Sequence, residues 1–304
     1  MNFLNFMKPE ICIGTAQFGM NYGITNNKGK IELDEIRKIL KFAKEKGIRF
    51  LDTARAYGDS EKNIGLNLKD KKDFNILTKI SPNEFNVWNR ASISIIDDHL
   101  KESLDKLKIS KLDGILFHRS SDLLLKGNKY LFRWIDKIIS QGLVNKVGVS
   151  IYESFELDDI PLEIINIVQL PLSIYDQRMI KSGMINMLKE KGISIHARSV
   201  FLQGLLLEMG NLPLFFSEDF RNHHQNFINF CNKNNISLLD GALSFISGIK
   251  ELEAVIFGIS CKKDLVQIYD SFYKINSFSD DLKNQLINFD WKHIKDLDPR
   301  TWTG

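Results

Sequence analysis

Four polar side chains in the first 120 residues are of the types that proton transfer needs: Asp52, Tyr57, Lys79 and His118. A lysine ammonium beside a phenol stabilises the phenolate and lowers the tyrosine pKa from about 10 toward working pH. Such a phenol can donate its proton to a carbonyl oxygen while hydride reaches the carbonyl carbon. A histidine can hydrogen-bond the same oxygen, and an aspartate can balance the lysine charge. The four residues are therefore suited to carbonyl reduction.

Each of these residues also has an ordinary structural explanation. An aspartate at the end of a strand often caps the next helix, and a lysine at a barrel rim often only pairs with such an aspartate. A lone histidine is more often structural, and a lone loop tyrosine is more often packed. Here, however, the four residues follow three consecutive predicted strands. That coincidence favours the catalytic interpretation.

Short apolar, β-rich runs alternate with longer amphipathic runs along the chain, which is the pattern of a parallel sheet wrapped by helices. The predicted strands are 11–14, 48–52, 75–79, 112–118, 146–150, 165–170, 193–198 and 254–258. The predicted helices are 33–46, 60–68, 90–107, 129–141, 180–191 and 263–274, with a short helical turn after the fifth strand. Glycines at 47, 142 and 192 are expected to end three of the helices.

Eight strand–helix units without a proline- or serine-rich linker predict a single α/β domain over residues 1–304, folded as a (β/α)8 TIM barrel. A doubly wound open sheet is the structural alternative. That fold normally carries Gly-x-Gly-x-x-Gly after its first strand, whereas the segment 14–19 reads GTAQFG. No phosphate-binding Gly-x-x-x-x-Gly-Lys-Ser/Thr loop occurs either. In a (β/α)8 barrel, side chains at the carboxyl ends of the strands converge, which brings the four polar residues together.

The same segments carry a family resemblance. Residues 51–58, LDTARAYG, resemble the Asp-Thr-Ala-x-x-Tyr-Gly segment of the aldo-keto reductases. The resemblance continues, in the family's order and approximate spacing, through 77–79, 116–118, 147–150, 168–169 and 255–258. It implies that Tyr57 is the proton donor, with Lys79, Asp52 and His118 as its partners.

The resemblance also implies residues that bind a nicotinamide cofactor. Ser150 and Gln169 match positions that hold the carboxamide, although Ile151 stands where the family usually has asparagine. Arg198 stands where the family has an aromatic residue that stacks on the nicotinamide, and a planar guanidinium can also stack. Ser199 and Gly204 are the best candidates to line the pyrophosphate.

The loop before the last helix is the expected phosphate site, because free backbone N–H groups at a helix start favour anions. Its candidate residues are Gly258, Ser260, Lys262 and Lys263. The two lysines suit the 2′-phosphate of NADP, so NADP is predicted, with NAD as the alternative. The arginine that many NADP-dependent members carry in this helix aligns near Asp264, which weakens that preference.

Substrate contacts are expected from loops. Arg119 follows His118 where many family members have tryptophan, and it suits a polar or anionic substrate, although a surface ion pair would also explain it. Tyr22, Trp291 and Trp302 are candidate walls of the pocket. The tail 276–304 resembles the C-terminal loop that closes over substrate in this family.

Composition excludes several other classes of protein. The chain has 41 basic and 38 acidic residues, a net charge of +3, which is unlike nucleic-acid or membrane-surface binders. The three cysteines form no Cys-x-x-Cys pair, and no 18-residue apolar run is present, so a cytoplasmic location is expected. No metal site is predicted, because His223 and His224 are adjacent and no His-Glu-x-x-His motif occurs. No Gly-x-Ser-x-Gly motif indicates a hydrolase.

The sequence thus predicts an NAD(P)H-dependent oxidoreductase that reduces an aldehyde or ketone to an alcohol, with a sugar or sugar derivative among the substrates that fit. The predicted partner is this small carbonyl compound, and no oligomeric state is predicted. The alternative is a catalytically weak, cofactor-binding regulatory subunit on the same fold. A lyase or isomerase barrel would leave Ser150, Gln169 and the last loop unexplained.

Overall fold

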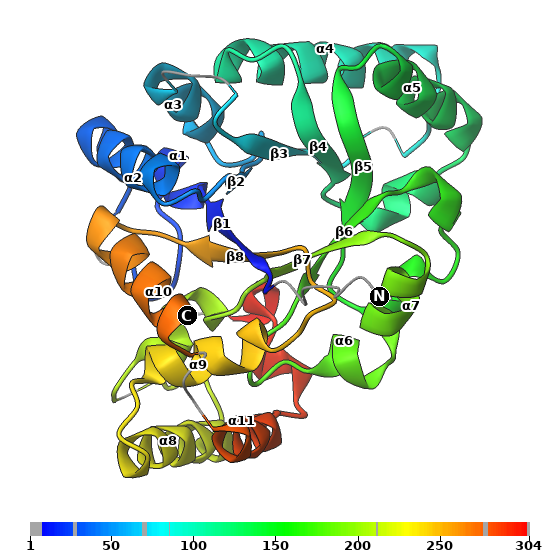
Figure 1. The fold of residues 1–304 in the computed structure, drawn as a ribbon. Coiled ribbons are helices and arrows are strands. Elements are labelled where there is room, and N and C mark those ends of the chain that lie inside the picture. The colour runs from blue at the N-terminus through cyan, green and yellow to red at the C-terminus, as the bar shows by residue number, and fades with distance from the viewer. Residues whose placement is uncertain are drawn as a thin grey trace, which may run out of the picture.

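Eight parallel strands form a closed barrel in which each strand pairs with its neighbours in chain order and β8 pairs with β1 (Figure 1). The computed structural model describes residues 8–26, 29–68, 72–84, 86–210, 212–275 and 279–302. The strands are β1 Glu10–Gly14, β2 Phe50–Asp52, β3 Asn75–Ile80, β4 Leu112–Phe117, β5 Val144–Ser150, β6 Ile167–Pro171, β7 Ser194–Arg198 and β8 Ala254–Gly258. The predicted (β/α)8 barrel is confirmed.

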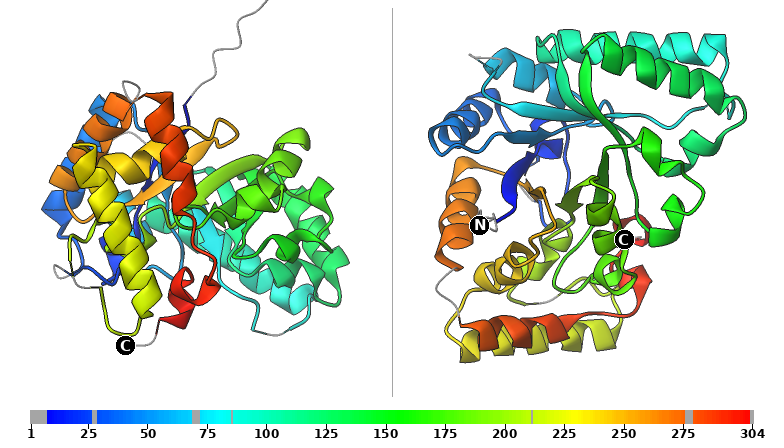
Figure 2. Two further views of the ribbon diagram at one scale, coloured as in Figure 1. Left: turned by 90° about the horizontal axis from the view of Figure 1, so that it is seen from below. Right: turned by 45° about the vertical axis from the view of Figure 1, so that its right-hand side comes forward.

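Helices surround the barrel, and their apolar residues recur every three or four positions so that one face packs on the strands (Figures 1 and 2). In α2, for example, Ile36, Ile39, Leu40 and Ala43 are buried. The helices are α1 Ala16–Gly19, α2 Leu33–Glu45, α3 Ser60–Asn67, α4 Arg90–Leu107, α5 Asn128–Ser140, α6 Arg178–Lys181, α7 Met184–Glu190, α8 Glu218–Lys233, α9 Leu238–Ser247, α10 Lys262–Lys274 and α11 Asp280–Leu286.

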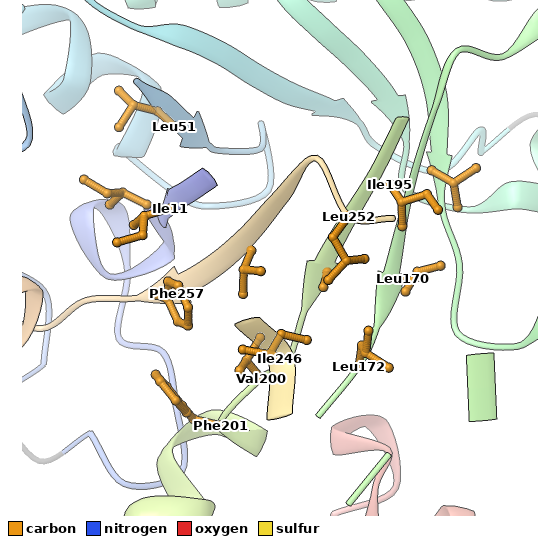
Figure 3. Packing of buried hydrophobic residues seen from close by; sticks show 14 of the residues in the cluster. Ile11, Leu51, Leu170, Leu172, Ile195, Val200, Phe201, Ile246, Leu252 and Phe257 are labelled. Carbon is orange, nitrogen blue, oxygen red and sulfur yellow. The ribbon is translucent and has the colours of Figure 1, made fainter. Parts of the chain in front are cut away.

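Two apolar clusters make the core. The larger one joins the strands to the helices, and Figure 3 shows part of it, including Leu170, Ile195 and Phe257 from three strands. The smaller cluster consists of Cys12, Phe50, Leu77, Leu116, Ile167, Ala254 and Ile256. These seven residues alternate along their strands with members of the larger cluster, so they fill the barrel interior. Since alternate residues share a face, Asp52 and Lys79 lie on the interior side, just above Phe50 and Leu77.

The helices of the structure differ from those predicted at several places. The helix predicted over 180–191 is two helices, α6 and α7, because Gly183 between them has φ +76°. Helices α8 and α9, between β7 and β8, were not predicted, although Ser217 and Ser237 cap their first turns. Helix α11 in the tail was also missed, and Figures 1 and 2 place it beside α8. The predicted helix ends at Gly47, Gly142 and Gly192 are confirmed, with φ near +70° at each.

Candidate active site

A buried ion pair lies where β2 and β3 end. Lys79 Nζ is 2.7 Å from both carboxylate oxygens of Asp52 and donates to the Thr53 carbonyl at 3.0 Å. The two residues are 1% and 4% exposed. Burial lowers the pKa of Lys79, but the opposing interactions, chiefly those with the Asp52 carboxylate, together hold the pKa above its ordinary value. The lysine is therefore a fixed cation at the top of the barrel interior.

Tyr57 and His118 lie next to this cation. The Lys79 ammonium is 5.1 Å from the centroid of the Tyr57 ring, and the rings of Tyr57 and His118 meet edge to face with centroids 6.3 Å apart. Tyr57 comes from the loop after β2, and His118 follows β4 directly. The structure thus brings together the four residues that the sequence singled out.

The net shift in the pKa of Tyr57 is opposite to the sequence prediction. Burial of the phenol raises its pKa above the ordinary value, and the Lys79 charge lowers it only in part. Desolvation dominates because the phenolate loses more stabilisation from water on burial than the single Lys79 cation supplies. Tyr57 is consequently a protonated phenol at neutral pH, which is the form that donates a proton.

His118 is neutral at physiological pH. Burial, together with the positive charge of Lys79, lowers the pKa of its imidazole to about 4. A neutral imidazole carries one N–H, which can be directed at a carbonyl oxygen. His118 is therefore equipped to orient a substrate oxygen without competing with Tyr57 as the acid.

A cavity of about 620 Å³ opens over these residues, within the usual size range of a ligand site. Tyr57 and His118 line one part of it, and Ser260, Asp264 and Ile268 of the α10 region line another. One continuous cavity thus connects the four polar residues with the start of α10.

The predicted carboxamide residues both line this cavity. Ser150 and Gln169 are paired across β5 and β6, and Gln169 Nε2 donates to Asp52 Oδ1 at 2.8 Å. Gln169 is therefore held in place by the ion pair as well as by its strand. Ile151, where an asparagine was expected, is fully buried and offers only its backbone to polar partners.

Arg198, at the end of β7, lines the cavity with its guanidinium carbon 4.0 Å from the centroid of the Tyr152 ring. It donates to the Ile151 carbonyl at 2.9 Å and to the Ser199 hydroxyl at 3.2 Å. These contacts hold the guanidinium over the tyrosine ring. The pair adds a cation and an aromatic ring to the cavity lining.

The loop after β7 bonds to the loop after β1. Gln203 accepts a hydrogen bond from Ile24 N–H through its side chain at 3.1 Å and one from Thr25 Oγ1 through its carbonyl at 3.1 Å. Ser199 and Gly204 have φ of +60° and +96° and line the cavity, as do Gln203 and Thr25. The segment 199–204 is therefore a tight backbone turn held against the cavity.

The predicted phosphate residues divide into two groups. Gly258 and Ser260 line the cavity, whereas Lys262 and Lys263 are exposed residues outside its lining. The Lys262 ammonium lies 5.7 Å from the centroid of the Phe42 ring on α2. The structure thus does not bring the two lysines to the cavity.

The cavity fits a nicotinamide dinucleotide in its chemistry. Hydroxyl, amide and guanidinium donors line it at Ser150, Gln169, Arg198 and Ser199. Gln17 Oε1, a buried acceptor, has no partner among the described residues and also lies at the cavity. A buried polar atom without a partner is costly, and a ligand donor would satisfy it.

Comparison with known proteins identifies the family. The model of the aldo/keto reductase family matches residues 10–286. The chain belongs to this family. Aldo/keto reductases generally depend on NAD(P)H and act on small carbonyl compounds.

Individual relatives of this aldo/keto reductase family member are distant. The glyoxal reductase of Bacillus subtilis (strain 168) is 24% identical over 187 residues, which cover 58% of this chain and 61% of that protein. The chain thus matches about three fifths of that relative's length.

Two solved structures resemble the fold more completely. A holo form of an aldo-keto reductase from Bacillus halodurans superposes with a TM-score of 0.73 at 18% sequence identity, covering 92% of this chain and 91% of the other. A thermostable aldo-keto reductase in complex with the inhibitor epalrestat gives 0.69 at 18%, covering 92% and 95%. At these identities the two solved structures support the barrel fold alone.

The candidate substrate residues of this aldo/keto reductase family member are only partly brought together. Tyr22 lines the cavity and is 42% exposed. Arg119 lies outside the lining. It donates hydrogen bonds to Asp122 and to the Asn83 carbonyl, so an ion pair, and not a substrate contact, accounts for this residue. Trp291 donates to Asp296 at 2.9 Å, and Trp302 packs edge to face on Phe216. Neither tryptophan lines the cavity.

Sequence reasoning missed several lining residues, among them Gln17, Tyr152 and Asp264. Gln17 and Tyr152 follow the ends of β1 and β5, where the barrel rule would have found them. The hydrogen bond from Ile24 N–H to Gln203 joins residues 179 positions apart, so no local signal predicts that contact. Asp264 was noticed only as a departure from the family.

Two further observations concern metal binding and membrane spanning. Among the described residues, no three histidine, cysteine or acidic side chains are grouped in a way that would hold a metal ion. In the same part of the chain, every helix is too short or too polar to cross a membrane.

Proposed function

We propose that this member of the aldo/keto reductase family reduces an aldehyde or ketone to an alcohol with hydride from NAD(P)H, and that Tyr57 donates the proton. The observation that carries the proposal is that Tyr57 and His118, beside the buried Lys79–Asp52 pair, line a cavity reaching α10. When bound, the nicotinamide supplies the hydride. Ser150, Gln169 and Arg198 are positioned to hold its ring end.

Each of the four polar residues has a distinct part in the proposed step. The neutral imidazole of His118 hydrogen-bonds the carbonyl oxygen and fixes its place beside the Tyr57 hydroxyl. Tyr57 then releases its proton to that oxygen, and the Lys79 ammonium stabilises the phenolate that forms. Asp52 keeps Lys79 charged and aimed, and water returns a proton to Tyr57 after the alcohol leaves.

The substrate proposed is a small carbonyl compound. The Bacillus subtilis relative is a glyoxal reductase, which makes dicarbonyls such as glyoxal a reasonable first choice. Sugars and sugar derivatives also fit a cavity of about 620 Å³ with many polar groups. The sequence-based preference for NADP over NAD depends on Lys262 and Lys263, neither of which lines the cavity.

The decisive experiment is to screen glyoxal, other small aldehydes, ketones and sugars while NADH and NADPH absorbance is followed. In Tyr57→Phe, turnover should fall by about 10²–10⁴, because the positioned acid is lost. Cofactor affinity should change by less than about threefold, since the ring remains. Tyr273→Phe is the matched control, because this exposed tyrosine of α10 lies outside the cavity lining.

Tyr57→Phe turnover within about threefold of wild type would overturn the assignment of the acid. Binding of the dinucleotide without reduction of any compound in the screen would instead favour the regulatory subunit. The buried Lys79–Asp52 pair favours the enzyme over that alternative. A cation beside the proton donor serves proton transfer, and binding of the cofactor alone does not require it. Burying such a pair is costly and needs a reason.

A further inference from the structure

The backbone N–H groups at the start of α10 are already bonded to carboxylates of this chain. Asp264 Oδ2 accepts from Ser260 N at 3.0 Å and from Cys261 N at 3.1 Å. The next donor, Lys262 N, is bonded to Glu35 Oε1 of α2 at 2.8 Å. Three consecutive donors that could bind an anionic ligand are thus satisfied from within the protein.

One of these two carboxylates belongs to the cavity wall. Asp264 lines the cavity together with Ser260 and Gln267, whereas Glu35 approaches the helix start from α2. Lys262 and Lys263, the cations that would offset a negative ligand there, lie outside the cavity lining, and the Lys262 ammonium lies over the Phe42 ring. This end of the cavity therefore offers a ligand a carboxylate acceptor in place of the usual N–H donors and lysines.

A carboxylate in the cavity wall repels a phosphate group but can bind a hydroxyl group. A phosphate monoester brings close to two negative charges and only acceptor oxygens, so it is repelled by Asp264, and it meets N–H groups at Ser260, Cys261 and Lys262 that are already bonded. A ribose hydroxyl can donate to the carboxylate in a charge-assisted hydrogen bond. The same acid-to-ribose contact distinguishes NAD sites in dinucleotide-binding open sheets.

We infer that Asp264 is a specificity residue that selects NAD(H) over NADP(H), because its carboxylate occupies the place of the 2′-phosphate at the start of α10. The inference rests on the proposed function, since it takes the α10 end of the cavity as the adenosine end. It reverses the cofactor preference predicted from Lys262 and Lys263. Glu35 is a positioning residue that removes the third N–H donor from use.

The test measures binding without turnover. ADP-ribose and 2′-phospho-ADP-ribose lack the nicotinamide, so their affinities, measured by calorimetry, report the adenosine end alone. NADH and NADPH are titrated in parallel by quenching of tryptophan fluorescence. The variants are Asp264→Asn, which removes the charge at nearly constant shape, and Glu35→Gln, which does the same at the second carboxylate. Asp270→Asn is the control, because it makes the same charge change on α10 outside this cavity.

The wild-type protein should bind ADP-ribose at least about tenfold more tightly than 2′-phospho-ADP-ribose. The phosphorylated ligand loses the hydrogen bond from its 2′-hydroxyl to Asp264, and its phosphate is repelled by the same carboxylate. Asp264→Asn should narrow this ratio at least about fivefold, chiefly by improving affinity for the 2′-phosphate. Glu35→Gln should narrow the ratio of the two affinities less, and Asp270→Asn should leave this ratio within about twofold of the wild-type value. Because Asp264 also caps α10, circular dichroism and a melting curve accompany each variant, and Glu35→Gln tests the same site if Asp264→Asn does not fold.

A wild type that prefers the 2′-phosphate, or an unchanged ratio in folded Asp264→Asn and Glu35→Gln, overturns the inference while the proposed function stands. A preference for ADP-ribose that weakens in these variants supports the inference even where no carbonyl compound is reduced. That result would count against the proposed function alone. Failure of both dinucleotides to bind overturns the two proposals together.

Discussion

At the scale of single residues, the pair Lys79–Asp52 decides what Tyr57 can do. Both members are almost fully buried, and Gln169 Nε2 adds a third hydrogen bond to the carboxylate. A buried pair contributes little net stability, but removing one partner leaves an uncompensated charge. Lys79 therefore links two properties that can be measured separately, namely the stability of the barrel and the acidity of the tyrosine.

We expect Lys79→Met to slow reduction and to move the alkaline limb of the pH–rate profile to higher pH. The sign follows because Lys79 lowers the pKa of Tyr57, so its loss raises that pKa and keeps the phenol protonated to higher pH. The free energy of unfolding should fall by about 3–5 kcal/mol, because Asp52 remains buried without its cation. Rate profiles and urea unfolding measure the two effects.

The double variant Lys79→Met/Asp52→Asn is the control for this prediction. It should recover most of the stability, because the amide is neutral and still accepts from Gln169, but it should not recover the rate. An alkaline limb that does not move in folded Lys79→Met would show that another group tunes the tyrosine.

At the scale of elements, close packing between α1 and the loop after β2 holds Tyr57 in place. Ser60 Oγ donates to the Thr15 carbonyl at 2.9 Å, and Thr15 N donates to the Asp52 carbonyl at 2.9 Å. Gly19, the last residue of α1, lies directly against the Tyr57 carbonyl and Ser60 N. A Cβ at position 19 would overlap both backbone atoms, so one of the two segments would have to move.

Gly19→Ala is therefore expected to displace the Tyr57 loop. Overpacking should reduce the free energy of unfolding by about 1–3 kcal/mol. A displacement of about 1 Å at the acid should lower kcat by about 10²-fold. Gly210→Ala is the matched control, because nothing lies within 4 Å of a Cβ built there. Equal kinetics for the two alanine variants would mean that the α1 contact does not position Tyr57.

At the scale of the whole molecule, the C-terminal segment joins parts of the barrel far apart in sequence. Trp291 N donates to the Tyr175 carbonyl at 2.8 Å, and Gln177 Nε2 donates to the Ile287 carbonyl at 2.8 Å. The Arg300 guanidinium carbon lies 3.5 Å from the centroid of Tyr152, the ring that also contacts Arg198 in the cavity. Closure of the tail over the site, like the single domain spanning 1–304, stays a prediction, and the tail is described only for residues 279–302.

Arg300→Ala tests whether the tail acts on the site. Loss of a cation–π contact of about 0.5–2 kcal/mol should raise KM by about two- to thirtyfold, because Tyr152 is freed at the cavity. The effect on kcat should stay within about threefold, because the four catalytic residues are untouched. Arg37→Ala, which breaks an exposed ion pair on α2, is the control. Kinetics of Arg300→Ala that match those of the control would separate the tail from the site.

Local patterns in the sequence were enough to predict the barrel and the place of its chemistry. Strand–helix alternation and the alternation of side chains along each strand are local patterns, so they predicted eight strands and the convergence of Asp52, Tyr57, Lys79 and His118 at their ends. The helices between β7 and β8 were not predicted, although the serines that cap them are local signals.

The net pKa of Tyr57 depends on the tertiary structure, because desolvation depends on every atom around the phenol. The tertiary structure also decided that Lys262 N–H meets Glu35, a residue 227 positions away, while the Lys262 ammonium lies over Phe42. Which partner a charged group finds depends on the packing of distant elements, and no local pattern in the chain encodes it.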